Sequence, residues 1–120
     1  MKRDLDLTRK ILEQVEEKSE GMGGVEIDIP GQSAQDVSYH VMLLNEAGFL
    51  TAVDLSDKGG LDWRPITLTW PGHEFLDAVR NDTVWRKIKE TVKDKGGSIP
   101  FEILKTLAIQ FAGSVFGVGR

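Results

Sequence analysis

The chain has no cysteine among its 120 residues, which excludes disulfide bonds and thiolate metal sites. This composition suits a reducing compartment, so we expect a cytoplasmic protein. The charged N-terminus, residues 1–6, lacks the apolar core of a signal peptide. The most apolar stretch, residues 99–118, is interrupted by Glu102, Lys105 and Gln110, so we expect no transmembrane helix and no membrane partner.

Positive charge is also scarce. The net charge is −4 and the isoelectric point is about 5.1. Proteins that coat nucleic acids neutralise phosphates with Lys and Arg, so the overall charge argues against that class. A sequence-specific DNA-binding protein with a local basic patch stays compatible with it.

Hydrophobic spacing predicts a first helix that is capped by Asp4 and ends near Lys18, with Leu7, Ile11 and Val15 on its buried face. Residues 21–24 predict a loop without a phosphate-binding fingerprint. Residues 25–29 alternate apolar and acidic side chains, which predicts a short half-buried strand that ends at Pro30.

A second helix is expected from a cap at Ser33 or Gln32 to about Ala47, followed by Gly48. Val37, Val41 and Leu44 would form its buried stripe. The residues expected to point away from that stripe are Gln35, Ser38, Tyr39, Met42 and Glu46.

Residues 49–55 and 64–70 predict two strands around a glycine-containing loop, with Ile66, Leu68 and Trp70 on one face of the second strand. A hairpin that follows a helix has the order of a winged helix. We therefore expect an α+β, winged-helix-like domain in residues 1–81. Residues 82–120 would form a C-terminal helical extension that packs on it, with a last helix from Ser98 to about Phe116.

Two segments carry a resemblance to known proteins. Residues 39–50, which include Leu44 and Gly48, resemble the end of a winged-helix recognition helix. Residues 68–76 are similar to the Leu-Thr-x-x-Gly-x-x-Phe-Leu junction that closes the wing in many such regulators.

Over roughly residues 2–90 the chain resembles the domain-of-unknown-function family numbered 2513, which comprises small bacterial and prophage proteins. The resemblance implies a winged-helix-like fold and a mobile-element context, without an established biochemical activity. The matching residues are Lys2, Arg3, Asp4, Leu7, Arg9, Ile11, Leu12, Tyr39, His40, Leu44, Ala47, Gly48, residues 68–70, residues 72–77 and Trp85.

The order of elements departs from a helix-turn-helix at one point. A separate helix normally braces the recognition helix against the DNA backbone. Only residues 21–31 separate the first two predicted helices, and most of them predict loop and strand. Either the bracing helix is reduced to a turn or the topology is altered.

The leading functional hypothesis, which depends on this fold-level analogy, is a DNA-binding transcriptional regulator of phage or mobile-element origin. Its helix would enter the major groove, where Gln can pair with adenine, and wing cations would contact phosphates. The candidate DNA-binding residues are Gln35, Ser38, Tyr39, Met42, Lys58 and Arg64.

The alternative is a protein-interaction module that binds a host or phage protein on the same scaffold without binding DNA. Residues 31–49 contain no Lys or Arg, whereas Asp36 and Glu46 are acidic. A contiguous basic surface on the second helix and the wing would favour DNA, and an acidic or apolar surface would favour a protein.

Enzymatic activity is not expected. No serine lies in a Gly-x-Ser-x-Gly elbow, and no HExxH arrangement occurs. His40 and His73 are expected to be structural, so we expect no metal and no cofactor. Among the tryptophans we expect Trp70 and Trp85 in the core and Trp63 exposed.

The last helix has a broader apolar face than a peripheral helix needs. An exposed apolar face marks a protein interface, so we expect a homodimer through the last two helices. The alternative is that this helix completes the monomer core. The candidate dimer-interface residues are Leu104, Leu107, Phe111 and Val115.

Overall fold

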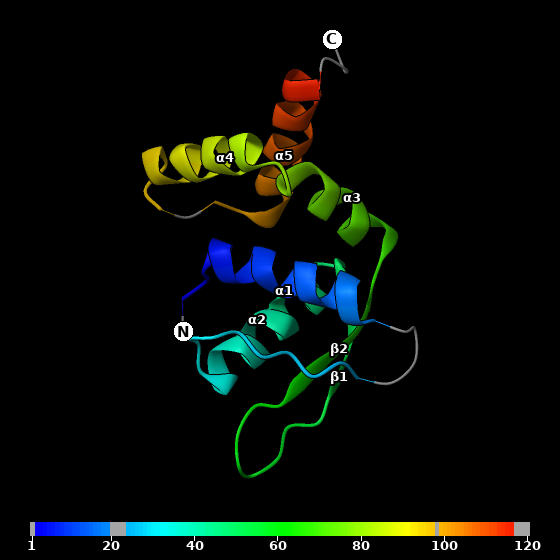
Figure 1. Cartoon of the computed structure of the whole chain (residues 1–120). Helices are drawn as coiled ribbons and strands as arrows, with labels where there is room; N and C mark the ends of the chain where they lie inside the picture. The colour runs from blue at the N-terminus through cyan, green and yellow to red at the C-terminus, as the bar shows by residue number, and fades with distance from the viewer. Residues whose placement is uncertain (1, 20–23, 98, 117–120) are drawn as a thin grey trace. The chain divides into compact units, whose positions relative to one another are not determined.

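The computed structural model describes residues 2–19, 24–97 and 99–116. Within them the chain is an α+β protein with five helices and one two-stranded antiparallel sheet (Figure 1). By contacts it divides into two compact units, residues 1–73 (unit 1) and residues 74–120 (unit 2). This division lies within α3, and the boundary expected between residues 81 and 82 stays a prediction. The elements are α1 Leu5–Lys18, α2 Ala34–Glu46, β1 Leu50–Asp54, β2 Trp63–Leu68, α3 Trp70–Val79, α4 Asp82–Asp94 and α5 Phe101–Phe116.

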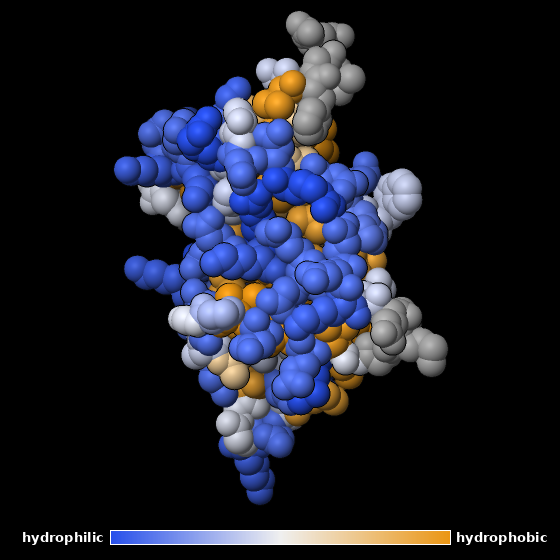
Figure 2. Space-filling view, in the orientation of Figure 1, coloured by the Kyte–Doolittle hydropathy of each residue, from blue (hydrophilic) through white to orange (hydrophobic). Residues whose placement is uncertain are grey.

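Helix α1 confirms its predicted cap and buried face. The Asp4 side chain accepts a hydrogen bond from the Leu7 amide at 3.2 Å, which satisfies one of the free N–H groups of the first turn. Leu7, Ile11 and Val15 are buried. Figure 2 shows mainly hydrophilic residues over the visible side of the helix, as expected for an amphipathic helix on a core.

Residues 24–29 are extended but do not form a strand of the sheet, so the predicted strand was wrong in this respect. Exposure alternates along them as expected, and Ile29 is buried. Their main-chain link to β2 is one hydrogen bond, from the Val25 amide to the Pro65 carbonyl at 2.7 Å. Pro65 has no N–H group and cannot return a bond, so a regular ladder is not completed. Of the loop predicted at residues 21–24, residues 21–23 lie outside the described residues.

Helix α2 begins and ends with side-chain and glycine signals that the sequence predicted. The Ser33 hydroxyl accepts a hydrogen bond from the Asp36 amide at 3.0 Å, so Ser33 is the cap. At the other end Gly48 has φ +82°, and the Phe49 amide donates to the Leu44 carbonyl at 3.0 Å. This is the Schellman ending, in which a left-handed glycine lets the chain reverse towards β1.

The two strands pair antiparallel with a β-bulge at Ile66. Thr51 lies opposite Thr67, whereas Ala52 lies opposite Pro65, which leaves Ile66 without a partner. The prediction that Ile66, Leu68 and Trp70 share a face was wrong, because an extra residue breaks the alternation of a strand. Leu68 is buried, whereas Trp70 starts α3 and is 77% exposed.

Side chains satisfy the main-chain groups around the bulge. The Ser19 hydroxyl donates to the Ile66 carbonyl at 2.8 Å. The Ala52 amide donates to the Asn45 side-chain oxygen at 3.1 Å. The bulge is therefore joined both to the end of α1 and to the end of α2.

The junction between β2 and α3 rests on Thr69 and Gly72. The Thr69 hydroxyl donates to the Gly48 carbonyl at 2.5 Å and accepts from the Gly72 amide at 3.1 Å. A Cβ atom at Gly72 would collide with the main-chain carbonyl of Phe49. These contacts explain why the predicted wing-closing pattern needs threonine and glycine at these positions.

Unit 2 is built from helices that pack against one another. Asn81 caps α4 by accepting from the Thr83 and Val84 amides, at 2.9 and 3.1 Å. A stripe of Trp85, Ile88 and Val92 is buried, and α4 packs against α5. Helix α5 begins at Phe101 rather than Ser98; Ser98 itself lies outside the described residues.

Candidate functional site

Helix α2 and the wing loop, defined as residues 55–62 between β1 and β2, carry the residues expected to bind DNA. Two of them join the helix to the hairpin instead of facing solvent freely. Gln35 is exposed, but its side-chain oxygen accepts from the Leu61 amide at 3.1 Å. Ser38 is only 6% exposed, and its hydroxyl accepts from the Trp63 amide at 3.0 Å. The expectation that Ser38 points away from the buried stripe was therefore wrong.

The other two candidate residues of α2 are half-buried. The Tyr39 ring packs edge-on against the His40 ring, with 5.8 Å between ring centroids. Met42 lies one turn before the end of the helix. Tyr39 and Met42 could therefore offer a binding partner only part of their side-chain surface.

The wing loop closes in a tight turn. Asp57 and Gly60 exchange two main-chain hydrogen bonds, at 3.2 and 3.1 Å, and the exposed Lys58 lies between them. Arg64, at the start of β2, pairs with Asp62 at 3.3 Å between Nε and Oδ1. Of the two expected phosphate-binding cations, Arg64 is thus already neutralised by a neighbouring carboxylate.

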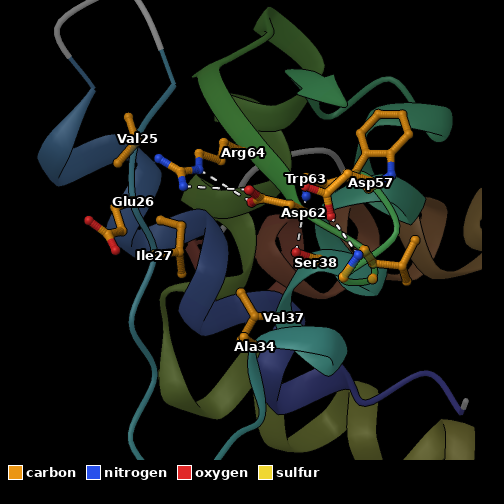
Figure 3. A pocket seen from close by; sticks show the side chains of 13 residues that line it. Val25, Glu26, Ile27, Ala34, Val37, Ser38, Asp57, Asp62, Trp63 and Arg64 are labelled. Atoms are coloured by element: carbon orange, nitrogen blue, oxygen red, sulfur yellow. Dashed lines mark hydrogen bonds and ion pairs between the residues drawn. The ribbon is translucent and has the colours of Figure 1, made fainter. Parts of the chain in front are cut away.

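A cleft of about 380 Å³ lies between residues 25–27, the first turns of α2 and the wing loop (Figure 3). Figure 3 shows Glu26 and Ile27 on one side and Asp62 and Trp63 on the other, with the Arg64 side chain extending between them. The apolar side chains that line it include Val25, Ile27, Ala34, Val37, Leu61 and Trp63. The acidic side chains are Glu26, Asp57 and Asp62.

The part of the chain that contains this cleft is acidic. Residues 24–68 contain seven Asp and Glu residues but only two Lys and Arg residues, a net charge of −5. Hydrogen bonds from the Ser56 hydroxyl and amide lower the pKa of Asp54 below its ordinary value, which keeps this strand-end carboxylate ionised. The seven acidic residues are Glu26, Asp28, Asp36, Glu46, Asp54, Asp57 and Asp62.

The two histidines lie in different surroundings, and the structural role expected for His73 stays a prediction. His40 is 2% exposed; its Nε2 atom accepts from the Asp4 amide at 2.8 Å, so the Nδ1 proton is donated to the Asp36 carbonyl at 2.7 Å. His73 lies 3.8 Å from the Glu16 carboxylate and is 46% exposed in its side chain. Among the described residues, no group of three or more His, Asp and Glu side chains is arranged to hold a metal ion.

The tryptophans differ from expectation at two positions. Trp85 is buried as predicted. Trp70 is exposed rather than buried, because the chain enters α3 at this residue. Trp63 is half-buried and lines the cleft rather than lying free on the loop.

The cleft itself was missed by sequence reasoning. Its acidic residues come from two separate segments: Glu26 lies in the extended segment before α2, and Asp57 and Asp62 lie in the wing loop. The signal available in the sequence was the absence of Lys and Arg from residues 31–49 together with the acidic positions of residues 25–29. Their convergence depends on the hairpin folding back onto α2.

The candidate dimer residues divide into two groups. Leu104 is 2% exposed and already belongs to the core of its own chain. Leu107, Phe111 and Val115 are half-buried. Among the side chains of α5 that the structure describes, the large exposed apolar residues are Ile103 and Ile109, at 50% and 53%. Within the described helices, no segment has the length and apolar character needed to cross a membrane.

Comparison with known proteins places the chain in a family. Residues 2–98 match the family described as "Hypothetical protein (DUF2513)". An uncharacterized protein of Haemophilus influenzae is 41% identical over 109 residues, which cover 90% of this chain and 92% of that relative. No solved structure matches the chain significantly. Because both matches span most of the sequence, the chain belongs to the DUF2513 family.

Proposed function

We propose that this chain is a non-catalytic protein-interaction module on a winged-helix-like scaffold, and that it works in the cytoplasm. The order α1, extended residues 24–29, α2, β1, wing loop and β2 supports the scaffold. No helix occurs between residues 24 and 33, where a helix-turn-helix would have its bracing helix. The observation that carries the functional proposal is the acidic surface of α2 and the wing loop.

This surface is poorly suited to a DNA duplex. Binding DNA requires cations that neutralise phosphates, and the cost of bringing carboxylates near phosphates rises as salt falls. Residues 24–68 have a net charge of −5, and one of their two cations, Arg64, is paired with Asp62. Of the two functions expected from the sequence, this charge favours binding to a protein.

The bonds between α2 and the hairpin support the same proposal. Base recognition by Gln35 would require its side chain to release the Leu61 amide. Ser38 would have to leave both its buried position and the Trp63 amide. If Gln35 and Ser38 gave up these bonds to contact DNA bases, the Leu61 and Trp63 amides would be left unpaired, which costs free energy.

A direct test is selection from a pool of random DNA duplexes at a series of salt concentrations. We expect no enrichment at low salt. Enrichment that weakens with rising salt and is lost in Lys58→Ala, but kept in the control Lys95→Ala, would instead support DNA binding. Both lysines are exposed, and they lie in different units.

We also propose that the chain forms a homodimer through α5. Ile103, Leu107 and Phe111 recur every four residues and so follow one stripe of the helix. Ile103 is 50% exposed and the other two are half-buried, so the stripe presents apolar surface beyond the core contact of Leu104.

Light scattering on the intact chain tests this second proposal. We expect a dimer that Ile103→Glu converts to monomer. Ile109→Glu is the matched control, because Ile109 has a similar exposure but lies roughly 120° away around the helix. A monomeric intact chain, or equal effects of the two variants, would contradict a dimer through this stripe.

A further inference from the structure

One wall of the cleft is an extended segment with open main-chain groups. The Val25 amide is bonded to the Pro65 carbonyl, but Glu26 and Ile27 form no main-chain hydrogen bond with the described residues. An extended segment with free N–H and C=O groups can pair with an added strand. This wall can therefore bind the main chain of an added strand as well as its side chains.

The opposite wall is held in place by α2. The Leu61 amide donates to Gln35, and the Trp63 amide donates to Ser38, so the edge of the hairpin does not depend on a ligand for its donors. Between the walls, Val37 and Leu61 provide apolar surface. The cleft of about 380 Å³ lies at the lower end of the range typical of binding pockets, roughly 300–1,000 Å³.

The charges of the cleft define the occupant. Glu26 makes no hydrogen bond or ion pair within the described part of the chain, and Asp57 uses one side-chain oxygen for the Gly59 amide at 2.7 Å. Among the described residues that line the cleft, Arg64 is the only cation, and it is paired with Asp62. A Lys or Arg side chain complements this arrangement, because its methylene stem packs on apolar surface while its charged end reaches the carboxylates.

We propose that the cleft binds a short extended segment of a partner protein that carries Lys or Arg between apolar residues. The segment pairs with Glu26 and Ile27 through its main chain and directs its cation to the carboxylates that line the cleft, among them those of Glu26 and Asp57. This inference rests on the proposed interaction function and names the class of partner segment.

The test begins with selection of a random peptide library on the immobilised full chain. Selected sequences are then synthesised, and their affinities are measured by fluorescence anisotropy at low and high salt. We expect enrichment of Lys and Arg flanked by apolar residues, and weaker binding at high salt because rim charges are screened.

Two variants locate the binding site. Glu26→Gln/Asp57→Asn keeps side-chain size and removes both charges, and we expect about tenfold weaker binding. Glu17→Gln/Glu90→Gln is the matched control, since both residues are exposed and neither lines the cleft. Ala34→Trp fills the cleft from an exposed position on the first turn of α2, and we expect it to abolish binding. Circular dichroism verifies that each variant folds.

The outcomes separate this inference from the proposed function. Peptides without enriched Lys or Arg, or binding unchanged by Ala34→Trp, overturn the cleft assignment and leave the interaction function standing. Failure to select any peptide also overturns it. Enrichment of DNA duplexes in the salt series, in place of peptides, overturns both proposals.

Discussion

The two units of this chain use different means to hold their elements together. In unit 1, side chains bond main-chain groups far along the chain: Ser19 reaches Ile66, and Thr69 reaches Gly48. In unit 2, the Asn81 cap and the Thr91 hydroxyl bond main-chain groups within four residues. Apolar stripes on α4 and α5 provide the packing between its helices.

The units also differ in charge. Unit 1 contains 13 acidic and 7 basic residues, a net charge of −6, whereas unit 2 contains 6 acidic and 8 basic residues, a net charge of +2.

The cost of losing a polar side chain should also differ between the units. Irregular segments need specific partners for their polar main-chain groups, while helices satisfy most of theirs locally. Single polar substitutions are therefore expected to cost more in unit 1 than in unit 2.

The largest effect is expected for Gly72→Ala in unit 1. The new Cβ would collide with the Phe49 carbonyl, and main chain cannot move aside without disturbing the junction of β2 and α3. We expect a loss of roughly 3 kcal/mol or more in the free energy of unfolding, measured by urea denaturation. The control in unit 2 is Gly96→Ala, which meets no atom and carries only the cost of a positive φ, about 1–2 kcal/mol. Equal losses would contradict the close approach at Gly72.

A smaller effect is expected from Thr69→Val, which keeps the side-chain shape and removes the hydroxyl. Two hydrogen bonds are lost, those to the Gly48 carbonyl and from the Gly72 amide, and we expect a loss of about 1–2 kcal/mol. The matched substitution in unit 2, Thr91→Val, removes one local bond to Lys87 and should change the unfolding free energy by less than about 0.5 kcal/mol. Comparable losses of unfolding free energy in the two variants would contradict the expectation that polar substitutions cost more in unit 1.

Ser38→Ala tests the link between α2 and the hairpin locally. The Trp63 amide loses its acceptor, and we expect its hydrogen exchange to become roughly 5- to 10-fold faster. Amides of α4 should keep their exchange rates, as should the whole chain in the exposed control Ser114→Ala. An unchanged rate at Trp63 would show that other contacts hold the hairpin.

The smallest effect concerns Asp54. Hydrogen bonds from the Ser56 hydroxyl and amide lower its pKa in the folded state, so it stabilises the fold above its ordinary pKa of 3.8. That contribution is lost as the pH falls through the lowered folded value. In urea titrations across this acid range, Asp54→Asn should show a slightly weaker dependence on pH than the wild type. The effect stays small because the carboxylate is fully exposed.

Local features of the sequence predicted the helices well. Asp4 and Ser33 act as the predicted caps, and Gly48 ends α2 with a positive φ, because these signals operate within a few residues. The buried stripes of α1, α2 and α4 follow from helical periodicity in the same way.

The sheet region was less predictable. Alternation predicted Ile66, Leu68 and Trp70 on one face, but the bulge at Ile66 and the start of α3 at Trp70 separate them. A bulge has no reliable signature in a single strand, because it depends on the register of the partner strand. Ser38 was misplaced for a related reason, since its burial depends on the hairpin folding back to bring the Trp63 amide to its hydroxyl.

The sequence by itself determined the caps, the helix stripes, the glycine turns and the shortage of cations around α2, because each is encoded within a few neighbouring residues. Only the tertiary structure decided that Ser38 and Gln35 hold the hairpin and that Glu26, Asp57 and Asp62 converge on one cleft. These groups meet because a bulged hairpin folds back onto α2, and such contacts between distant segments leave no local period in the sequence.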